Sequence, residues 1–194
     1  MIATGRRDHD FLLLAEQWLP AAPEVIWPFV TDCRHMNFVI PPWIRFDVRD
    51  EVIPPLATGV RYHYRLGLHG VPLSWTTEIK EVEPTRFFAD EQAEGPYARF
   101  RHEHWFLPRG GGTLTRDRVI YRPPGGPLAG LGDALVVRRD LRKLFENRHR
   151  VLAELYANGK DPASMLSVGA GGGGTDAEGR GVDRSEAAEL PGGA

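Results

Sequence analysis

The chain has 194 residues, a formal net charge of -2 and a hydrophobic fraction of 42%. The near-neutral charge gives no general reason to bind nucleic acid or an anionic membrane. The longest apolar run, Phe11 to Ala15, is far shorter than the roughly 20 residues that a membrane-spanning helix needs. We therefore expect no nucleic-acid partner and no stable insertion into a membrane.

Two further features bear on the cellular compartment in which the protein is found. No basic segment followed by about 7–15 apolar residues is visible at the start of the chain, so we expect no secretory signal. Cys33 is the single cysteine, which excludes an internal disulfide and a four-thiolate metal site. A reducing, cytoplasmic setting is the simplest interpretation, and the sequence leaves the oligomeric state open.

The composition divides the chain into two parts. The 5 Trp, 5 Tyr and 9 Phe all lie at or before Tyr156, whereas ten of the 22 glycines lie from Gly159 onward. Residues 1–158 have the apolar content of one globular domain. Residues 159–194 cannot build a core, so we predict a disordered, glycine-rich tail there, with a short partner-binding segment as the alternative.

The first element predicted in the domain is a strand over residues 10–19. Pro23 then marks the start of a helix that extends to about Thr31, and a second short helix over 33–40 ends before two consecutive prolines. Alternating residues separated by short turns predict six further strands, over 44–52, 59–67, 71–81, 86–92, 98–107 and 113–122. Because such short connections cannot hold crossover helices, the seven-stranded sheet must be antiparallel.

A long helix is predicted from about Asp133 to Asn158, with Gly159 placed to end it. Its apolar residues recur at i, i+3, i+4 and i+7, which gives one apolar face. We interpret the other face as solvated, because acidic residues are interspersed with its basic ones. These basic residues are Arg138, Arg139, Arg142, Lys143, Arg148 and Arg150. Together the elements indicate an α+β fold in which this helix covers a curved sheet.

The last two strands place ionisable residues on the predicted inner face. The even positions of 98–107 are Phe100, His102, His104 and Phe106. The odd positions include two arginines and Glu103, which belong in water, so the even positions should point inward. The inward set of 113–122 is Thr115, Asp117, Val119 and Tyr121.

The register of this hairpin depends on its turn. If the turn is Pro108 to Gly111, His102 lies opposite Asp117, whereas a two-residue slip places His104 there instead. Either register gives a His–Asp contact on the inner face.

Neighbouring strands extend this inner wall. Tyr62 and Tyr64 alternate with charged residues, and Trp75 and Thr77 alternate with polar ones. A dry core tolerates few hydroxyls, imidazoles and carboxylates, because each unpaired group costs a few kcal/mol. We therefore predict a cavity that holds a ligand or water. The alternative is a core in which each polar group has its own protein partner.

Four segments, 22–32, 70–97, 100–106 and 111–126, resemble the START-related ligand-binding superfamily, also called SRPBCC or polyketide cyclase/dehydrase-like. The matching positions are Gly95, Pro96, Tyr97, His102, His104, Phe106, Thr113, Asp117 and Tyr121. The resemblance covers about residues 9 to 157 and is to a bacterial branch of the superfamily. It implies a helix-grip fold, in which a seven-stranded antiparallel sheet wraps around the long helix and encloses an apolar cavity. Members of the superfamily carry lipids, sterols or hormones, or catalyse cyclisation and dehydration.

We predict that residues 1–158 form a START-like domain that binds a small apolar or amphipathic ligand, such as a lipid, a polyketide or an isoprenoid-like molecule. Apolar and aromatic walls would surround the ligand, and a polar group would orient one end of it. The predicted ligand-binding residues are Tyr62, Tyr64, Trp75, Thr77, Phe100, His102, His104, Phe106, Asp117 and Tyr121. A glycine-rich segment, 123–132, is either a simple connector or a rim of this cavity.

The alternative is a cyclase or dehydratase. A histidine oriented by Asp117 could move a proton next to a carbonyl that Tyr121 polarises. No catalytic residue is assigned on this basis. A metal held by His102, His104 and Asp117 is a third possibility, but two histidines two residues apart are weak evidence, so the sequence predicts no metal and no cofactor.

Overall fold

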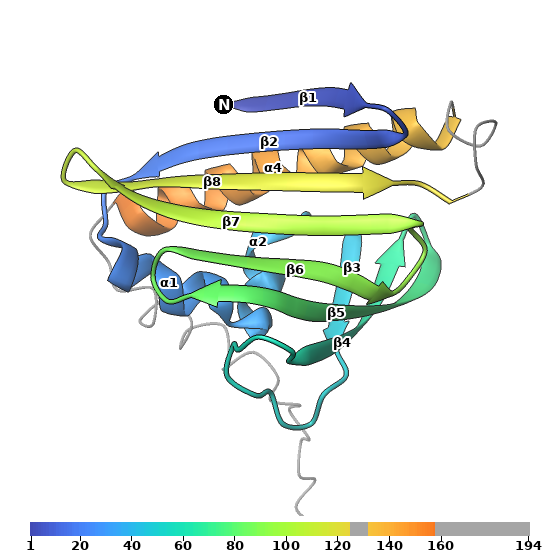
Figure 1. Ribbon diagram of the computed structural model, residues 1–194, viewed down its shortest axis with the longest axis horizontal. Coiled ribbons are helices and arrows are strands. Elements are labelled where there is room, and N and C mark those ends of the chain that lie inside the picture. Colours follow the sequence, from blue (N-terminus) through green and yellow to red (C-terminus); the bar gives the residue numbers. More distant parts are fainter. Residues whose placement is uncertain (125–131, 158–194) are drawn as a thin grey trace, which may run out of the picture. The chain divides into compact units, whose positions relative to one another are not determined.

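The computed structural model describes residues 1–124 and 132–157. It contains one antiparallel sheet with the strand order β1-β2-β8-β7-β6-β5-β4-β3 (Figure 1). The strands are β1 Ile2–Arg7, β2 Asp10–Leu19, β3 Ile44–Val48, β4 Arg61–Leu68, β5 Val71–Glu83, β6 Phe87–Glu94, β7 Arg99–Arg109 and β8 Gly112–Arg122. The helices are α1 Pro23–Thr31, the 3-10 helix η1 Cys33–His35, α2 Met36–Val39 and α4 Gly132–Ala157.

This architecture confirms the predicted α+β fold, with a curved antiparallel sheet and a long helix. Two details differ from the prediction. The sheet has eight strands rather than seven, because Ile2–Arg7 pairs with β2 as an edge strand. Most of β1 is exposed, so it lacks the alternation of apolar residues by which a half-buried strand is detected. The predicted helix over 33–40 is divided into η1 and α2.

The β7–β8 hairpin has the slipped register. Arg109 pairs with Gly112, so the turn consists of Gly110 and Gly111 alone, and His104 lies opposite Asp117. The four-residue turn from Pro108 to Gly111 was therefore wrong. Both turn glycines have positive φ, 59° and 77°, which is typical of the two-residue turns whose twist matches that of the flanking strands.

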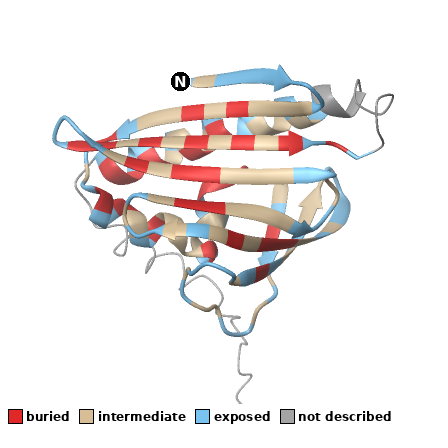
Figure 2. Cartoon of the chain, in the orientation of Figure 1, coloured by how far each residue is buried: buried red, intermediate tan, exposed pale blue. Residues whose placement is uncertain are grey.

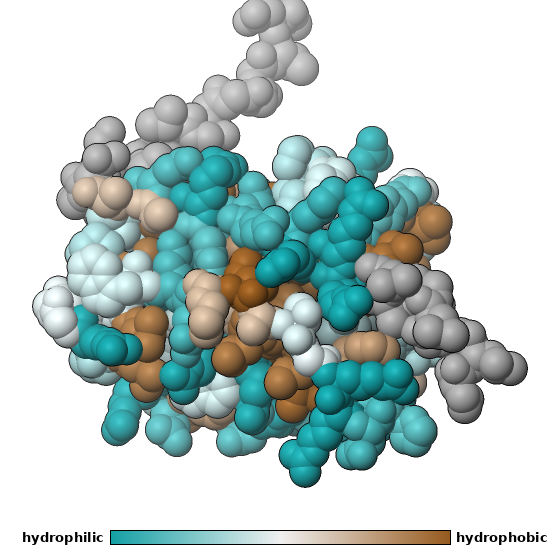
Figure 3. Space-filling view, turned by 90° about the horizontal axis from the view of Figure 1, so that it is seen from above, coloured by the Kyte–Doolittle hydropathy of each residue, from teal (hydrophilic) through white to brown (hydrophobic). Residues whose placement is uncertain are grey.

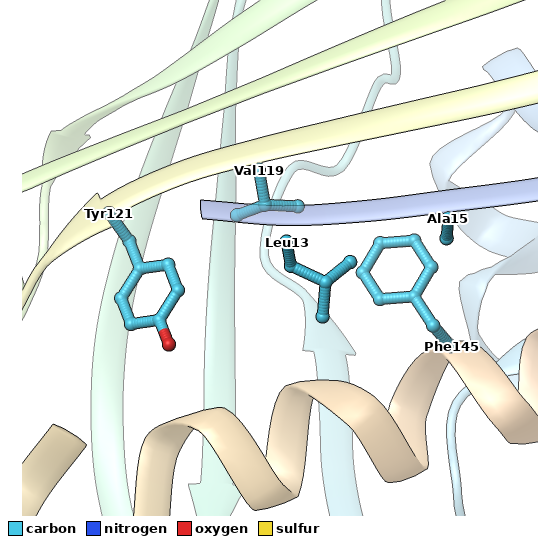
Figure 4. Packing of buried hydrophobic residues seen from close by; sticks show 5 residues of the cluster. All are labelled: Leu13, Ala15, Val119, Tyr121 and Phe145. Atoms are coloured by element: carbon cyan, nitrogen blue, oxygen red, sulfur yellow. The ribbon is translucent and has the colours of Figure 1, made fainter. Parts of the chain in front are cut away.

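One half of the sheet packs directly against α4. Figure 4 shows Phe145 of α4 pointing toward Leu13 and Ala15 of β2 and Val119 of β8, with Tyr121 beside them. All five residues are almost completely buried, and buried segments follow β2 and β8 along their length (Figure 2). This solid half forms the main hydrophobic core.

The other half of the sheet, β3 to β6, curves away from α4. Register shifts in the β5–β6 pairing lie between Thr76 and Thr77 and between Ile79 and Glu81, and such irregularities bend a strand. The short helices complete the enclosure: α1 contacts β7, and α2 contacts α4. We call β3 to β6 and these short helices the hollow half.

Polar side chains fix α4 against both halves. The amide of Asn147 donates to the Val39 carbonyl of α2 at 2.8 Å, and the amide of Gln17 on β2 donates to the His149 carbonyl at 2.7 Å. The helix is therefore positioned by directional bonds as well as by apolar contact.

The outer face of the sheet contains a buried carboxylate that was expected to lie in water. Glu103 is only 4% exposed. It accepts from Arg101 at 2.9 Å and also pairs with Arg118, whose guanidinium lies over the Trp105 ring. The long side chains of these arginines cover Glu103 while their charged ends stay near solvent, which explains the error.

The surface and the remaining segments complete this description. Seen from the β1 side, hydrophilic side chains surround smaller groups of hydrophobic ones (Figure 3). None of the helices in the described residues is long and apolar enough to cross a membrane. The predicted tail over 159–194 and most of the 123–132 segment lie outside the described residues.

Candidate functional site

The hollow half encloses a cavity of about 450 Å³. Its walls come from the inner faces of β3 to β8, from α1, η1 and α2, and from α4. Alternation along the strands produces this wall, because every second side chain of β4 and β5 points inward. The α4 residues that line the cavity are Val137, Asp140, Leu141, Leu144, Phe145, Arg148 and Leu152, which recur every three or four positions.

Seven of the ten predicted ligand-binding residues line this cavity. They are Tyr62, Tyr64, Trp75, Thr77, Phe100, His102 and His104. The other three are buried elsewhere. Phe106 packs edge-on against Trp27 of α1, and Tyr121 stacks on Phe11 within the solid half. Asp117 does not line the cavity itself, but it contacts His102, His104 and Arg148, which do.

Polar atoms of the aromatic wall already have hydrogen-bond partners within the protein. The Trp75 indole donates to the Thr77 hydroxyl at 2.9 Å, and the Tyr62 hydroxyl donates to the Pro54 carbonyl at 3.1 Å. Burial raises the pKa of Tyr62 to about 12 and raises that of Tyr64 still further, so both phenols stay protonated. This part of the wall therefore offers mainly ring faces and aliphatic groups to a ligand.

A compact cluster of charged and imidazole groups forms the polar part of the wall. His102 Nε2 lies 3.2 Å from Asp117 Oδ1, and His104 Nδ1 lies 2.9 Å from the same oxygen. On its other side, His104 Nε2 lies 3.2 Å from Asp90 Oδ2. The two imidazole centroids are 3.7 Å apart, and the His104 ring also stacks on Phe88 at 4.0 Å.

Arg148 of α4 completes this polar cluster. Its Nη1 lies 3.2 Å from Asp117 Oδ1, and the residue is only 8% exposed. Burial opposes ionisation of Asp117, but Arg148 and the two histidines outweigh burial and hold the pKa of this carboxyl well below its usual value. Asp117 is therefore a charged acceptor shared by three cationic or imidazole groups.

The pKa values of the two histidines shift in opposite directions. Burial, and then the neighbouring His104, lower the pKa of His102. Burial would also lower the pKa of His104, but its contacts with Asp117 and Asp90 outweigh burial and raise it. The pair therefore places a neutral imidazole beside one that is more readily charged.

Asp90 and Arg148 were not among the predicted site residues. Arg148 was assigned to the solvated face of the long helix, which was wrong. Its position three residues after Phe145 and four before Leu152 would have placed it on the apolar face. Asp90 lies two residues after Phe88 in a predicted strand, so the same alternation would have placed it on the inner wall.

The polar cluster also contains three groups that could hold a metal. One donor atom each from Asp90, His102 and His104 lies within 4.8 Å of the other two. Asp117, the carboxylate considered for this role from the sequence, is not one of the three. It instead contacts the two imidazoles from behind.

A curved antiparallel sheet with a long helix and a cavity between them is the helix-grip class of α+β protein. The sequence matches the family described as polyketide cyclase / dehydrase and lipid transport over residues 19–148, more than half of the chain. The protein therefore belongs to this family, as the resemblance predicted. No curated protein matches the sequence.

Solved structures share the fold at low sequence identity. The aromatase/cyclase ZhuI from Streptomyces sp. R1128 superimposes with a TM-score of 0.59 and 15% identity, over 77% of this chain and 94% of that one. Ara h 8.0201 gives 0.58 and 12%, over 77% and 99%. TTHA0849 from Thermus thermophilus gives 0.55 and 20%, over 73% and 96%. These likenesses concern the fold alone.

Proposed function

We propose that the protein binds a small apolar or amphipathic ligand in the cavity between the sheet and α4. The observation that carries the proposal is the cavity itself, which combines aromatic and aliphatic walls with one polar cluster. Ligand sites in proteins are typically apolar pockets of about 300–1,000 Å³ with a few convergent polar groups. The family description, which includes lipid transport, also supports the proposal.

The size of the cavity narrows the ligand class. A volume of about 450 Å³ is about three times that of the ~150 Å³ apolar cavity known to bind benzene. A ligand of two or three fused rings, or an isoprenoid or acyl chain of similar volume, fits this space. We place its polar end, such as a hydroxyl or carbonyl, at His102 and His104.

The direct test is to identify what the protein retains. Native mass spectrometry of the full chain, followed by solvent extraction and mass analysis, is expected to show an apolar molecule in stoichiometric amount. If the protein is isolated empty, titration with a fluorescent apolar probe should show saturable binding at one site. Absence of both a retained molecule and probe binding would refute the proposal.

A matched pair of variants assigns the binding to this cavity. Leu73 lines the cavity, whereas Leu114 lies on the outer face of β8. Leu73→Trp is expected to fill part of the space and weaken probe binding at least tenfold, while Leu114→Trp should leave binding unchanged. Equal effects of the two substitutions would mean that the probe binds elsewhere.

A second candidate is a cyclase- or dehydratase-type enzyme. The contact between His102 and Asp117 favours it, because a carboxylate fixes the orientation of an imidazole that faces the cavity. Tyr121 does not line the cavity, but Tyr97 does. Burial raises the pKa of Tyr97, so it keeps a proton to donate to a carbonyl. Once a ligand is identified, His102→Gln should abolish its conversion while preserving its binding; unchanged turnover would exclude this role.

We also propose that the protein resides in the cytoplasm. Cys33, the single cysteine, is buried and has no disulfide, as a reducing compartment allows.

A further inference from the structure

We propose that Asp90, His102 and His104 bind one divalent transition-metal ion on the cavity wall. The site goes beyond the proposed binding of an apolar ligand and does not depend on it. The strand pairing brings the three residues together, because Asp90 of β6 is the direct partner of His102 of β7, and His104 follows on the same face. Their donor atoms lie within 4.8 Å of one another.

The spacing between Asp90 and His104 fits a shared metal. Zinc–nitrogen and zinc–oxygen bonds are about 2.0–2.2 Å long, so two ligands at a tetrahedral angle lie roughly 3.3–3.5 Å apart. His104 Nε2 and Asp90 Oδ2 are 3.2 Å apart. Both atoms present lone pairs to each other when the imidazole carries its proton on Nδ1, so a cation must lie between them. That cation is either a proton or a metal ion.

Asp117 orients one of the two imidazoles for this role. Its Oδ1 lies 3.2 Å from His102 Nε2 and accepts the ring proton there, so the lone pair of His102 is on Nδ1. His104 Nδ1 lies 2.9 Å from the same oxygen without making a hydrogen bond, and His104 Nε2 faces Asp90. Histidines that bind metals usually donate their other ring proton to a carboxylate or carbonyl, which fixes the tautomer and the ring orientation. Asp117 accepts such a bond from His102.

The local charge also favours a cation. With both imidazoles neutral, Asp90 and Asp117 carry two negative charges, and Arg148 beside Asp117 neutralises one of them. One negative charge is left close to the three donor atoms. The rings of Phe88 and Phe145 pack on His104 and His102, so this charge lies in surroundings of low polarity, where its attraction for a cation is weakly screened.

The donor set indicates the class of metal. Two imidazoles and one carboxylate suit zinc, iron(II) or cobalt(II) rather than magnesium or calcium, which prefer oxygen ligands. Three protein ligands leave a further position open. All three residues line the cavity, so an oxygen of a molecule in the cavity could occupy that position.

The test uses the full chain after chelation and removal of any retained apolar molecule. Titration with Co²⁺ alone is expected to give one ion per chain and the d–d absorption of a four- or five-coordinate site. Zn²⁺ should displace it stoichiometrically. If Co²⁺ does not bind, or binds with the spectrum of a hexa-aqua ion, the proposal is overturned.

Three variants locate the ion. Asp90→Asn and His104→Gln are expected to weaken Co²⁺ binding at least 100-fold. The control is His63→Gln, which removes the exposed histidine that pairs with Asp50 at 2.8 Å, and it should bind Co²⁺ as wild type does. Because Asp90 is partly exposed, Asp90→Asn should fold normally, which circular dichroism checks. Unchanged binding in Asp90→Asn, or an equal loss in His63→Gln, would place the ion elsewhere.

Failure of this site and failure of the proposed function are distinguishable. Apolar-probe binding is measured on the metal-free protein, and Co²⁺ binding on the ligand-free protein. A protein that binds the probe but not Co²⁺ has the cavity without the metal site.

Discussion

The solid and hollow halves of the sheet share one covering helix but present different side chains to it. In the solid half, Leu13, Ala15 and Val119 meet Phe145 with almost no exposed area. In the hollow half, the inward residues of β4 and β5 end on a cavity instead of on the helix. The apolar packing of α4 is therefore concentrated in the solid half, whereas the strands of the hollow half stand off from the helix and enclose space.

The boundary between the halves passes through β7 and β8. Val119 and Phe145 belong to the core cluster and also line the cavity. The polar cluster lies at this boundary, with Asp117 buried behind the wall and His102, His104 and Arg148 lining the cavity. Its charges are therefore supported by a rigid core while its imidazoles remain accessible to a ligand.

The largest expected effect is the loss of the solid core. Phe145→Ala should lower the free energy of unfolding by about 4 kcal/mol, because it removes a buried ring and leaves a cavity between α4 and β2. Urea denaturation measures the change. The control Val136→Ala, on the exposed side of the same helix, should change stability by less than about 0.5 kcal/mol. Similar losses in both variants would mean that the helix itself, rather than this contact, determines stability.

Removal of the cation at the boundary comes next. Arg148→Met should cost about 3 kcal/mol, because the Asp117 carboxylate loses its strongest charged partner while it stays buried. The double variant Arg148→Met/Asp117→Asn is expected to recover part of this loss. On the outer face, where Arg118 remains 44% exposed beside Glu103, Arg118→Met should cost less than Arg148→Met. The reverse order would contradict the role of Arg148 as the charged partner of the buried Asp117.

A pair of leucine truncations compares the two halves directly. Leu13→Ala should cost about 3 kcal/mol, whereas Leu73→Ala should cost about 1 kcal/mol, because its side chain borders existing space and truncation enlarges the cavity without unpacking a core. The expected difference is about 2 kcal/mol by urea denaturation. Equal costs would show that the hollow half is packed as tightly as the solid one.

The smallest effect concerns pH in the hollow half. Asp32 accepts from the side chain of Arg34 and from its backbone N–H, and these bonds outweigh burial and lower the pKa of Asp32 below its ordinary 3.8. A lowered pKa contributes stability that is present above 3.8 and is lost as the pH falls through the folded-state value. Asp32→Asn should therefore reduce stability at pH 6 by less than about 1 kcal/mol. The deficit should shrink as the pH falls below 3.8, and a deficit that stays constant over that range would argue against this linkage.

Local patterns predicted most of the fold. Pro23 and the apolar spacing after it gave the bounds of α1, and alternation identified the inward faces of β7 and β8, including Phe100, His102 and Asp117. The edge strand β1 was not predicted. It is held by backbone pairing with β2, and its exposed side chains show no alternation that would reveal this pairing. The register of the β7–β8 hairpin depends on the turn, in which Gly110 and Gly111 have positive φ. The alternating residues of the two strands do not determine the length of this turn.

The candidate site was predicted less completely, because it depends on contacts between distant segments. Alternation predicts that Asp117 points inward. It does not predict that neighbouring side chains, including His102 and His104, cover Asp117 so that it does not line the cavity. Arg148 was assigned to solvent because an arginine was expected to be hydrated, yet the helix turns it toward Asp117. Tyr121 and Phe106 face inward as predicted. However, Tyr121 packs against Phe11 and Phe106 packs against Trp27, so neither lines the cavity.

The pairing of β2 with β8 bears on when the cavity forms during folding. Gln17 and Thr115, joined in this ladder, are 98 residues apart in the chain. Closing so long a loop is slow, since its entropic cost precedes the contacts that compensate it. The cavity also needs α4, which follows β8 in the chain. We therefore expect ligand uptake to be one of the last steps in refolding. The signal of a cavity-bound fluorophore should appear later than the main change in far-UV circular dichroism.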